Sequence, residues 1–391
     1  MITALIFIAI LSVLVLVHEW GHFVTARKSG MKVHEFGFGF PPRAFGVYKD
    51  PGSGKWIWVK GRGTSMLRQT VGGSERKIAD EFPATLYSVN WLPLGGFVKI
   101  KGENGEETED CDSFGYHKAW KKLVVLLSGV AMNVLLAAVL LSFGFTVGLP
   151  AEASLLQDPR AIVVEESAVL VQQVEDNSPA EAGGLQFGDK ILSIDGISIH
   201  TATQMIEYVR AHSKENMTLV LERQDQTESI VLKPAELQSG AAPRLGIVLA
   251  DAGVVRYPWY IALYKGFVAA GIALFNIFIG FYILIKGLIL GDGMAFGVAG
   301  PVGIAVVVGQ SARLGFHYLL NVTAMISLSL AAINVLPIPA LDGGRALFVI
   351  IQKFIGRPVP MKYEQAAHTI GFILLMILIV AVTYKDVAGL L

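Results

Sequence analysis

The sequence has little cysteine and little charge. One cysteine, Cys111, among 391 residues excludes an intrachain disulfide. Charged residues make up only 16% of the chain, hydrophobic residues make up 53%, and the mean hydropathy is +0.54. Soluble domains carry about 25% charged residues, so this composition excludes an ordinary soluble protein. We predict a polytopic α-helical membrane protein.

Neither sign of charge is in excess, because 32 Lys and Arg residues balance 32 Asp and Glu residues. A nucleic-acid-binding chain usually has a basic surplus, so we expect no nucleic-acid partner. The charges are nevertheless segregated: residues 27–122 hold 16 basic and 11 acidic side chains, whereas residues 151–258 hold 8 basic and 16 acidic ones. The positive-inside rule therefore favours a cytoplasmic 27–122 segment and an extracytoplasmic 151–258 segment.

Long stretches without charge predict about four transmembrane helices, each near the 20 apolar residues that a bilayer requires. The first is retained rather than cleaved, because no basic residue precedes it and no small-x-small site follows it. Asn133, an isolated amide in the second, should face the bundle interior and serve helix packing. The predicted spans are residues 1–26, 123–150, 317–345 and 366–385.

Residues 259–312 are harder to assign. Hydropathy alone indicates a span at 259–285. However, His18 and Asp342, which are candidate ligands of one metal ion for the reasons given by their motifs, must then lie on the same side of the membrane. A crossing at 259–285 breaks that parity unless the Gly300-Pro301 segment also returns. We therefore expect 259–312 to be interfacial or re-entrant, and the glycines and proline of Phe296–Ile304 to break the helix.

A soluble module is inserted between the spans. The stretch Ser178–Gly196 predicts a short helix that starts at Ser178-Pro179 and ends at Gly183-Gly184, then a strand and a tight Asp195-Gly196 turn. This pattern resembles the core of a PDZ domain over residues 161–250. PDZ domains bind a peptide as an added strand, so the resemblance implies that this module binds a peptide. The open alternative is that the module binds nothing and only restricts access to the site by its size.

One stretch places reactive groups at the end of the first span. His18-Glu19-Trp20-Gly21-His22 sets two imidazoles four residues apart on one helix face. His18 and His22 can then bind one metal ion while Glu19 acts on a bound water, which is the pattern of a zinc hydrolase. The alternative is a pair of interfacial histidines that cap a membrane anchor. Ionisable residues at the edge of a span are costly and usually functional, which favours the metal site.

A catalytic zinc site needs another protein ligand and an open position for water. Asp342 is the best candidate, because Pro337 and Pro339 interrupt regular helix before it and allow its carboxylate to turn toward the bundle centre. A surface aspartate in a Pro/Gly turn is the alternative. It is less expected here, because the two-histidine helix lacks one protein ligand.

The polar segment 27–122 contains aromatic runs that Gly and Pro interrupt, such as Trp91–Ile100. Such runs predict short strands or loops that dip into the membrane face beside the site. Ordinary strands of a cytoplasmic lobe fit the pattern equally well.

Together these motifs resemble the site-2 protease family of intramembrane zinc metalloproteases, in particular bacterial regulator-of-sigma-E proteases. The resemblance runs in order over nearly the whole chain. It rests on His18–His22, Gly95–Lys99, the PDZ-like insert, Gly300-Pro301-Val302-Gly303 and Asn334–Gly344.

The resemblance implies one zinc ion per chain, bound by His18, His22 and Asp342. It implies Glu19 as the catalytic base and Asn334 as a residue that holds the substrate or its oxyanion. It also implies that an unwound substrate strand pairs with Gly95, Gly96, Phe97, Val98 and Lys99. Two departures bear on substrate gating: the chain has one PDZ-like domain rather than a tandem pair, and its Tyr48–Tyr87 region is longer than usual.

The expected function is hydrolysis of peptide bonds within transmembrane segments of single-span proteins, for example anti-sigma factors or signal-peptide remnants. The expected location is the inner membrane, with the PDZ-like domain outside the cytoplasm, open to a peptide or substrate ectodomain. A membrane adaptor with a structural metal is one alternative. A metal transporter is another, but it needs several ligand clusters along a path, and the spans offer one.

Overall fold

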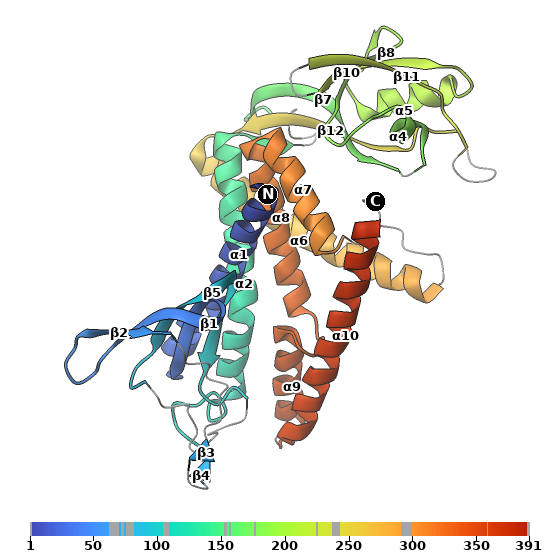
Figure 1. Cartoon of the computed structure of the whole chain (residues 1–391). Coiled ribbons are helices and arrows are strands. Elements are labelled where there is room, and N and C mark those ends of the chain that lie inside the picture. Colours follow the sequence, from blue (N-terminus) through green and yellow to red (C-terminus); the bar gives the residue numbers. More distant parts are fainter. Residues whose placement is uncertain are drawn as a thin grey trace. The chain divides into compact units, whose positions relative to one another are not determined.

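The computed structural model describes residues 2–61, 70–71, 74–75, 82–104, 109–151, 155, 158–175, 177–223, 226–236, 243–290, 299–357 and 359–388. The chain divides into two compact units (Figure 1). Unit 1 comprises Met1–Ala138, Ala270–Gly309 and Thr323–Leu391; unit 2 comprises Val139–Ala269 and Gln310–Val322. All candidate site residues lie in unit 1.

Five helices in the described part of the chain are long and apolar enough to cross a membrane. Their hydrogen bonds satisfy the backbone internally, which a hydrocarbon environment requires. Four of them coincide with the predicted spans, and α6 is additional. They are α1 (Ile2–Lys28), α2 (Ala119–Val147), α6 (Trp259–Leu290), α8 (Phe316–Val335) and α10 (Met361–Ala388).

Helix α6 covers most of the segment that the sequence predicts to be interfacial or re-entrant. It is one continuous helix of 32 residues. It contains no proline, and its glycines are too widely spaced to break it. No turn therefore interrupts residues 259–285. By length and composition α6 can cross a bilayer, and its orientation to the membrane stays a prediction.

The predicted third span, 317–345, is two helices rather than one. Helix α8 ends at Val335, and a separate helix, α9 (Asp342–Ile355), begins at the candidate ligand. Pro337 and Pro339 lie between them, and proline both removes a helical hydrogen-bond donor and disfavours helix at the preceding residue. The break frees Asp342 from the register of α8.

Helix α7 (Pro301–Leu314) accounts for the Gly300-Pro301 motif. Proline at the first helical position suits the start of a helix. The carboxylate of Asp386, on α10, accepts hydrogen bonds from Gly300 N at 3.2 Å and from Gly303 N at 2.7 Å. The motif is therefore a helix start that α10 caps. The residues 296–298 of the predicted break lie outside the described residues.

Unit 1 also contains a β-sheet with the strand order β2-β1-β5. The strands are β1 (Val33–Lys49), β2 (Trp56–Lys60) and β5 (Leu86–Ile100). Phe36 pairs with both Tyr87 and Val98, so the first part of β1 lies between the two halves of β5. Residues 96–100 of β5 consequently form one edge of this sheet. A separate two-residue pair, β3 (Thr70–Val71) with β4 (Ser74–Glu75), lies in the Tyr48–Tyr87 region, most of whose remaining residues after 61 are outside the described residues.

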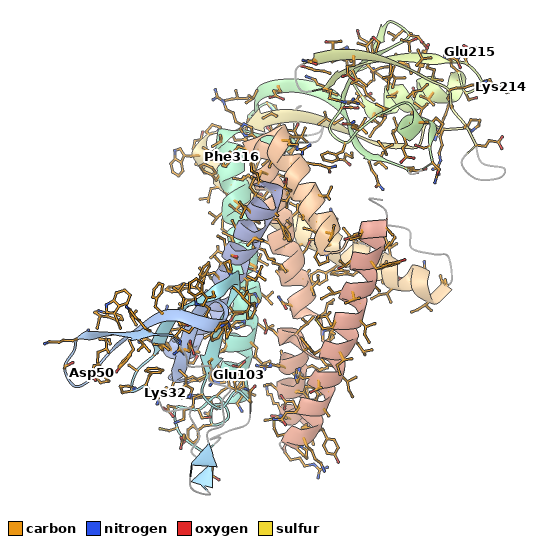
Figure 2. All side chains as sticks on the ribbon, in the orientation of Figure 1. Lys32, Asp50, Glu103, Lys214, Glu215 and Phe316 are labelled. Atoms are coloured by element: carbon orange, nitrogen blue, oxygen red, sulfur yellow. The ribbon has the colours of Figure 1, made fainter. Side chains whose placement is uncertain are left out.

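The turn that follows β5 connects the sheet to α9. Glu103, labelled in Figure 2, forms an ion pair with Arg345 of α9. Just before it, the Lys101 ammonium contacts Asp112 at 2.9 Å, and this hydrogen bond lowers the pKa of Asp112. The Glu103–Arg345 pair joins the turn after β5 to the helix that carries Asp342, and the Lys101–Asp112 pair joins the end of β5 to the segment before α2.

Unit 2 contains the inserted module, whose sheet has the order β11-β10-β8-β7-β12-β6, with β9 paired to β8. Two short helices, α4 and α5, complete it. Their bounds are β6 (Leu149–Ala151), β7 (Ile162–Val174), α4 (Pro179–Ala182), β8 (Lys190–Ile194), β9 (Ile197–Ser198), α5 (Ala202–Ala211), β10 (Met217–Arg223), β11 (Gln226–Leu232) and β12 (Ile247–Arg256).

The turn chemistry predicted for this module is present. The Ser178 hydroxyl caps α4 by accepting a hydrogen bond from Glu181 N at 3.2 Å. Asp195 and Gly196 have φ angles of 48° and 82°, as the tight turn between β8 and β9 requires. Residues Ile162–Val174 form one continuous strand, β7. The predicted fold class, a polytopic helical membrane protein with β elements and one PDZ-like insert, is confirmed.

Candidate metal centre and active site

Helix α1 presents His18 and His22 on one buried face. Their side chains follow each other by one helical turn, and the residues are only 7% and 6% exposed. The ring centroids lie 4.8 Å apart in an edge-on arrangement. Two imidazoles with converging nitrogens in an apolar bundle need polar partners, because a buried polar group without one is costly.

Asp342 supplies such a partner from the other end of the chain. Its Oδ2 lies 2.9 Å from His18 Nε2 and 3.3 Å from His22 Nε2, while the two Nε2 atoms are 3.1 Å apart. The structure brings together the three residues that the sequence predicts as metal ligands.

The triangle has the size of one face of a zinc coordination tetrahedron. Zinc–ligand bonds of about 2.0 to 2.1 Å place neighbouring ligands of a tetrahedron roughly 3.3 Å apart. The three measured separations, 2.9 to 3.3 Å, match that value. Two imidazoles and one carboxylate are also zinc ligands of an open, catalytic type, because three protein ligands leave the fourth position free. The residues present therefore fit zinc.

The outer nitrogen of His22 is held by the backbone. His22 Nδ1 lies 2.8 Å from the carbonyl oxygen of Val125 on α2. A carbonyl can only accept, so the proton sits on Nδ1 and the lone pair on Nε2 is left for a metal. Fixing the tautomer in this way is the usual function of outer partners of metal-binding histidines.

Asn133 plays the matching part for His18. Its side chain is 1% exposed, as the predicted interior position requires, and its Nδ2 lies 3.4 Å from His18 Nδ1. Its Oδ1 is buried and has no hydrogen-bond partner among the described residues. A half-turn of the amide exchanges these two atoms and gives Nδ1–H the acceptor it needs when Nε2 binds a metal. Asn133 thus does more than pack helices.

We expect Asn133→Leu to lower zinc affinity about tenfold, because His18 Nδ1–H then loses its acceptor. Asn133→Asp should keep the affinity at or above that of the unmodified protein, since a carboxylate also accepts. Competition against a zinc chelator of known affinity measures both. Asn276→Leu, the same change at an exposed position of α6, is the control. An Asn133→Leu protein with unchanged zinc affinity would contradict this role.

Two glycines allow α1 and α2 to cross closely at the site. A Cβ built on Gly129 would lie 2.5 Å from His22 Nε2 and 2.6 Å from His18 Nε2. A Cβ on Gly21 would lie 2.5 Å from the carbonyl oxygen of Ser128. Gly129 is not among the site residues predicted from the sequence. Its signal was the four-residue spacing to Asn133, which places both on one face of α2.

The edge of the sheet formed by the end of β5 lies beside Glu19. A Cβ on Gly96 would come within 3.8 Å of Glu19 Cγ, and a Cβ on Gly95 within 2.8 Å of Val15. Gly95 has a φ of +88°, which favours glycine. Phe97, Val98 and Lys99 continue along β5 and pair with β1. The structure therefore brings the Gly95–Lys99 run next to the candidate base.

Asn334 is less directly connected to the site. It is half-buried and lies one residue before the end of α8. The backbone after it reaches Asp342's neighbour, because a Cβ on Gly343 would lie 2.4 Å from Val335 O. Among the described contacts, none joins the Asn334 side chain to the three ligand atoms.

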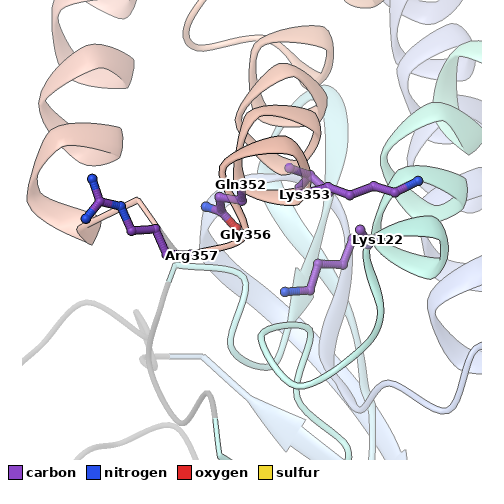
Figure 3. A pocket seen from close by; sticks show the side chains of 7 residues that line it. Lys122, Gln352, Lys353, Gly356 and Arg357 are labelled. Carbon is purple, nitrogen blue, oxygen red and sulfur yellow. The ribbon is translucent and has the colours of Figure 1, made fainter.

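A hollow elsewhere in unit 1 contains none of these residues. It is lined by Ala119, Lys122, Val349, Gln352, Lys353, Gly356 and Arg357, at the start of α2 and the end of α9 (Figure 3). The charged ends of Lys353 and Arg357 point away from each other in this view. The charged ends of Lys353 and Arg357 therefore do not converge on a single position.

Comparison with known proteins supports a peptidase assignment. The sequence model of peptidase family M50 matches residues 6–53 and 65–378. A Clostridium perfringens protein with a provisional zinc-metalloprotease name is 32% identical over 378 residues, which is 96% of this chain and 96% of that protein. Zinc metalloprotease RasP of Oceanobacillus iheyensis is 27% identical over 445 residues and 100% of both chains.

Among solved structures, the PDZ domain of an SdrC-like protein from Listeria monocytogenes is 27% identical, over 22% of this chain and 93% of that chain, with a TM-score of 0.21. The family match, in contrast, extends along most of the sequence and includes both ends of the candidate metal site. The chain therefore belongs to peptidase family M50, the site-2 protease family, and is a multi-pass membrane zinc metalloprotease.

Proposed function

We propose that this protein is an intramembrane endopeptidase that hydrolyses peptide bonds within transmembrane segments of single-span membrane proteins, such as anti-sigma factors or signal-peptide remnants. One observation carries the proposal: His18 Nε2, His22 Nε2 and Asp342 Oδ2 lie 2.9 to 3.3 Å from one another inside an apolar helix bundle. We assign one zinc ion per chain to these three atoms.

Glu19 is the proposed catalytic base. Zinc, when bound, polarises the scissile carbonyl and lowers the pKa of its water to about 7. The Glu19 carboxylate accepts the proton of the attacking water and passes it to the leaving nitrogen. Its position next to His18 on α1 and beside Gly96 supports this role. Asn334 is assigned to hold the carbonyl oxygen as negative charge develops on it.

The sheet edge at the end of β5 is the proposed substrate-binding element. A peptide bond in a membrane helix is shielded by its own hydrogen bonds, so the substrate must unwind before it can be cut. Main-chain groups of Gly95–Lys99 can bind the unwound segment as an added strand. Their closeness to Glu19 supports this assignment, because a strand docked there passes the candidate base.

We propose the inner membrane as the location, with the PDZ-like module on the extracytoplasmic side. The support is the charge distribution, basic between the first two helices and acidic in the module. A peptide or the ectodomain of a substrate is the proposed partner of the module. We expect no nucleic-acid partner, because the chain has no net charge.

Metal removal tests the proposed activity. A chelator should abolish cleavage of a single-span substrate by the purified protein, and stoichiometric zinc should restore it, because the base alone cannot activate water at neutral pH. Substrate fragments are measured by gel electrophoresis and mass spectrometry. Cleavage that continues after the metal is removed would sink the metalloprotease mechanism. Zinc binding without any cleavage would favour the adaptor.

Site-specific cross-linking tests the strand assignment. A photoreactive residue in place of Lys99, in a Glu19→Gln background, should cross-link a co-expressed single-span substrate near its cleavage position. The same residue in place of Trp58, which is 70% exposed on β2, is the control and should give little product. Equal cross-linking at both positions would argue against an added strand on β5.

A further inference from the structure

A half-buried histidine outside the metal triangle contacts the loop that carries the third ligand. His368, on α10, accepts a hydrogen bond through Nδ1 from the backbone N–H of Ala340 at 2.8 Å. Because Nδ1 accepts, the ring proton lies on Nε2, and this atom is buried without a hydrogen-bond partner among the described residues. The ring therefore makes one hydrogen bond, through Nδ1 to Ala340, while its Nε2–H has no acceptor among the described residues.

Ala340 needs an external partner. Its φ of +81° lies in the left-handed region, which residues other than glycine rarely adopt and which persists only when the surroundings enforce it. Ala340 precedes Asp342 by two residues, in the loop between α8 and α9. The bond from His368 acts directly on this strained residue.

A second contact from α10 holds the same loop. A Cβ on Gly371 would lie 2.5 Å from the carbonyl oxygen of Pro339 and 2.7 Å from its Cβ, so only glycine allows this approach. Gly371 follows His368 by three residues, which places both on one face of α10. Two adjacent loop residues, Pro339 and Ala340, therefore rest on one helix face.

The position of this loop decides where the Asp342 carboxylate lies. Asp342 is the first residue of α9, and its Oδ2 must stay within 2.9 to 3.3 Å of both histidine nitrogens to complete the triangle. Movement of Ala340 changes the start of α9 and carries the carboxylate away from α1.

We propose that His368 and Gly371 form a clamp on α10 that positions Asp342 for metal binding. His368 is a positioning residue rather than a ligand, and it acts only through the loop. This inference rests on the proposed function, in which Asp342 binds zinc.

Zinc affinity of the purified full-length protein, measured by chelator competition, tests the clamp. His368→Leu should weaken zinc binding about tenfold. His368→Asn should restore most of the affinity, because its Oδ1 takes the place of Nδ1, whereas His368→Gln, whose acceptor lies one bond further out, should not. Gly371→Ala should weaken binding as His368→Leu does. Gly280→Ala, where a Cβ meets nothing within 4 Å, should have no effect.

A double-mutant cycle separates positioning from general damage to the fold. In an Asp342→Ala background, which leaves the two histidines, His368→Leu should cause no further loss of zinc affinity. The clamp is overturned if His368→Leu leaves the affinity of the otherwise unmodified protein unchanged, or weakens it equally in both backgrounds. A protein with native Asp342 and His368 that binds no zinc at all would instead refute the proposed function.

Discussion

Glu19→Gln protein is expected to retain its zinc and to cleave a single-span substrate at least about a hundredfold more slowly, the lower end of what positioned bases contribute. Glutamine has nearly the shape of glutamate, so the packing of α1 should survive. It cannot accept the proton of the attacking water. The zinc ligands are His18, His22 and Asp342 in the proposed site, and none of them is altered.

Two measurements on the same preparation decide this prediction: metal content, and the rate of cleavage. Glu215→Gln, an exposed carboxylate in the PDZ-like module (Figure 2), is the matched control and should behave as the unmodified protein does. Undiminished cleavage by the Glu19→Gln protein removes Glu19 from the mechanism. Loss of zinc together with cleavage would mean that Glu19 stabilises the metal site instead.

Gly129→Ala should have an effect of similar size by a different route. The added methyl group would lie 2.5 to 2.6 Å from both imidazole Nε2 atoms, in the space where their lone pairs converge. We expect both zinc and cleavage to be lost. Alanine normally stabilises a helix by up to about 1 kcal/mol relative to glycine, so a weaker α2 cannot explain the loss.

Gly280→Ala provides the same substitution in α6, where the new Cβ has no neighbour within 4 Å. This protein should bind zinc and cleave substrate normally. Metal analysis of membranes extracted in parallel makes the comparison direct. If the Gly129→Ala protein binds zinc with unchanged affinity, then α1 and α2 do not cross as closely as described here.

Much of the candidate site could be predicted because its signals are local. The four-residue spacing of His18 and His22 needs only the pitch of a helix. Asp342 stood out because prolines interrupt the apolar run before it. The PDZ-like module was recognisable from its turns, where Asp195-Gly196 has a backbone conformation that few other residue pairs allow.

Other features depend on contacts between distant parts of the chain, which the sequence indicates only weakly. Gly129 matters because of the two imidazoles that face it, and His368 because of Ala340 across the bundle. The division of 317–345 into α8 and α9 was within reach, since Pro337 and Pro339 were visible. For residues 259–285, hydropathy favours a span and the parity of the site residues favours an interfacial or re-entrant segment; the structure shows one continuous helix there.

The crossing of α1 and α2 also limits the route by which a substrate polypeptide can reach the proposed metal site. At Gly21 and Gly129 the two helices pack too closely for another chain to lie between them, and a polypeptide could pass there only if His18 and His22 moved apart. We therefore predict that a substrate reaches the proposed site on the side of the β5 edge, where a Cβ on Gly96 would lie 3.8 Å from Glu19 Cγ. Mobility in this enzyme should be concentrated there, while α1 and α2 remain packed against each other.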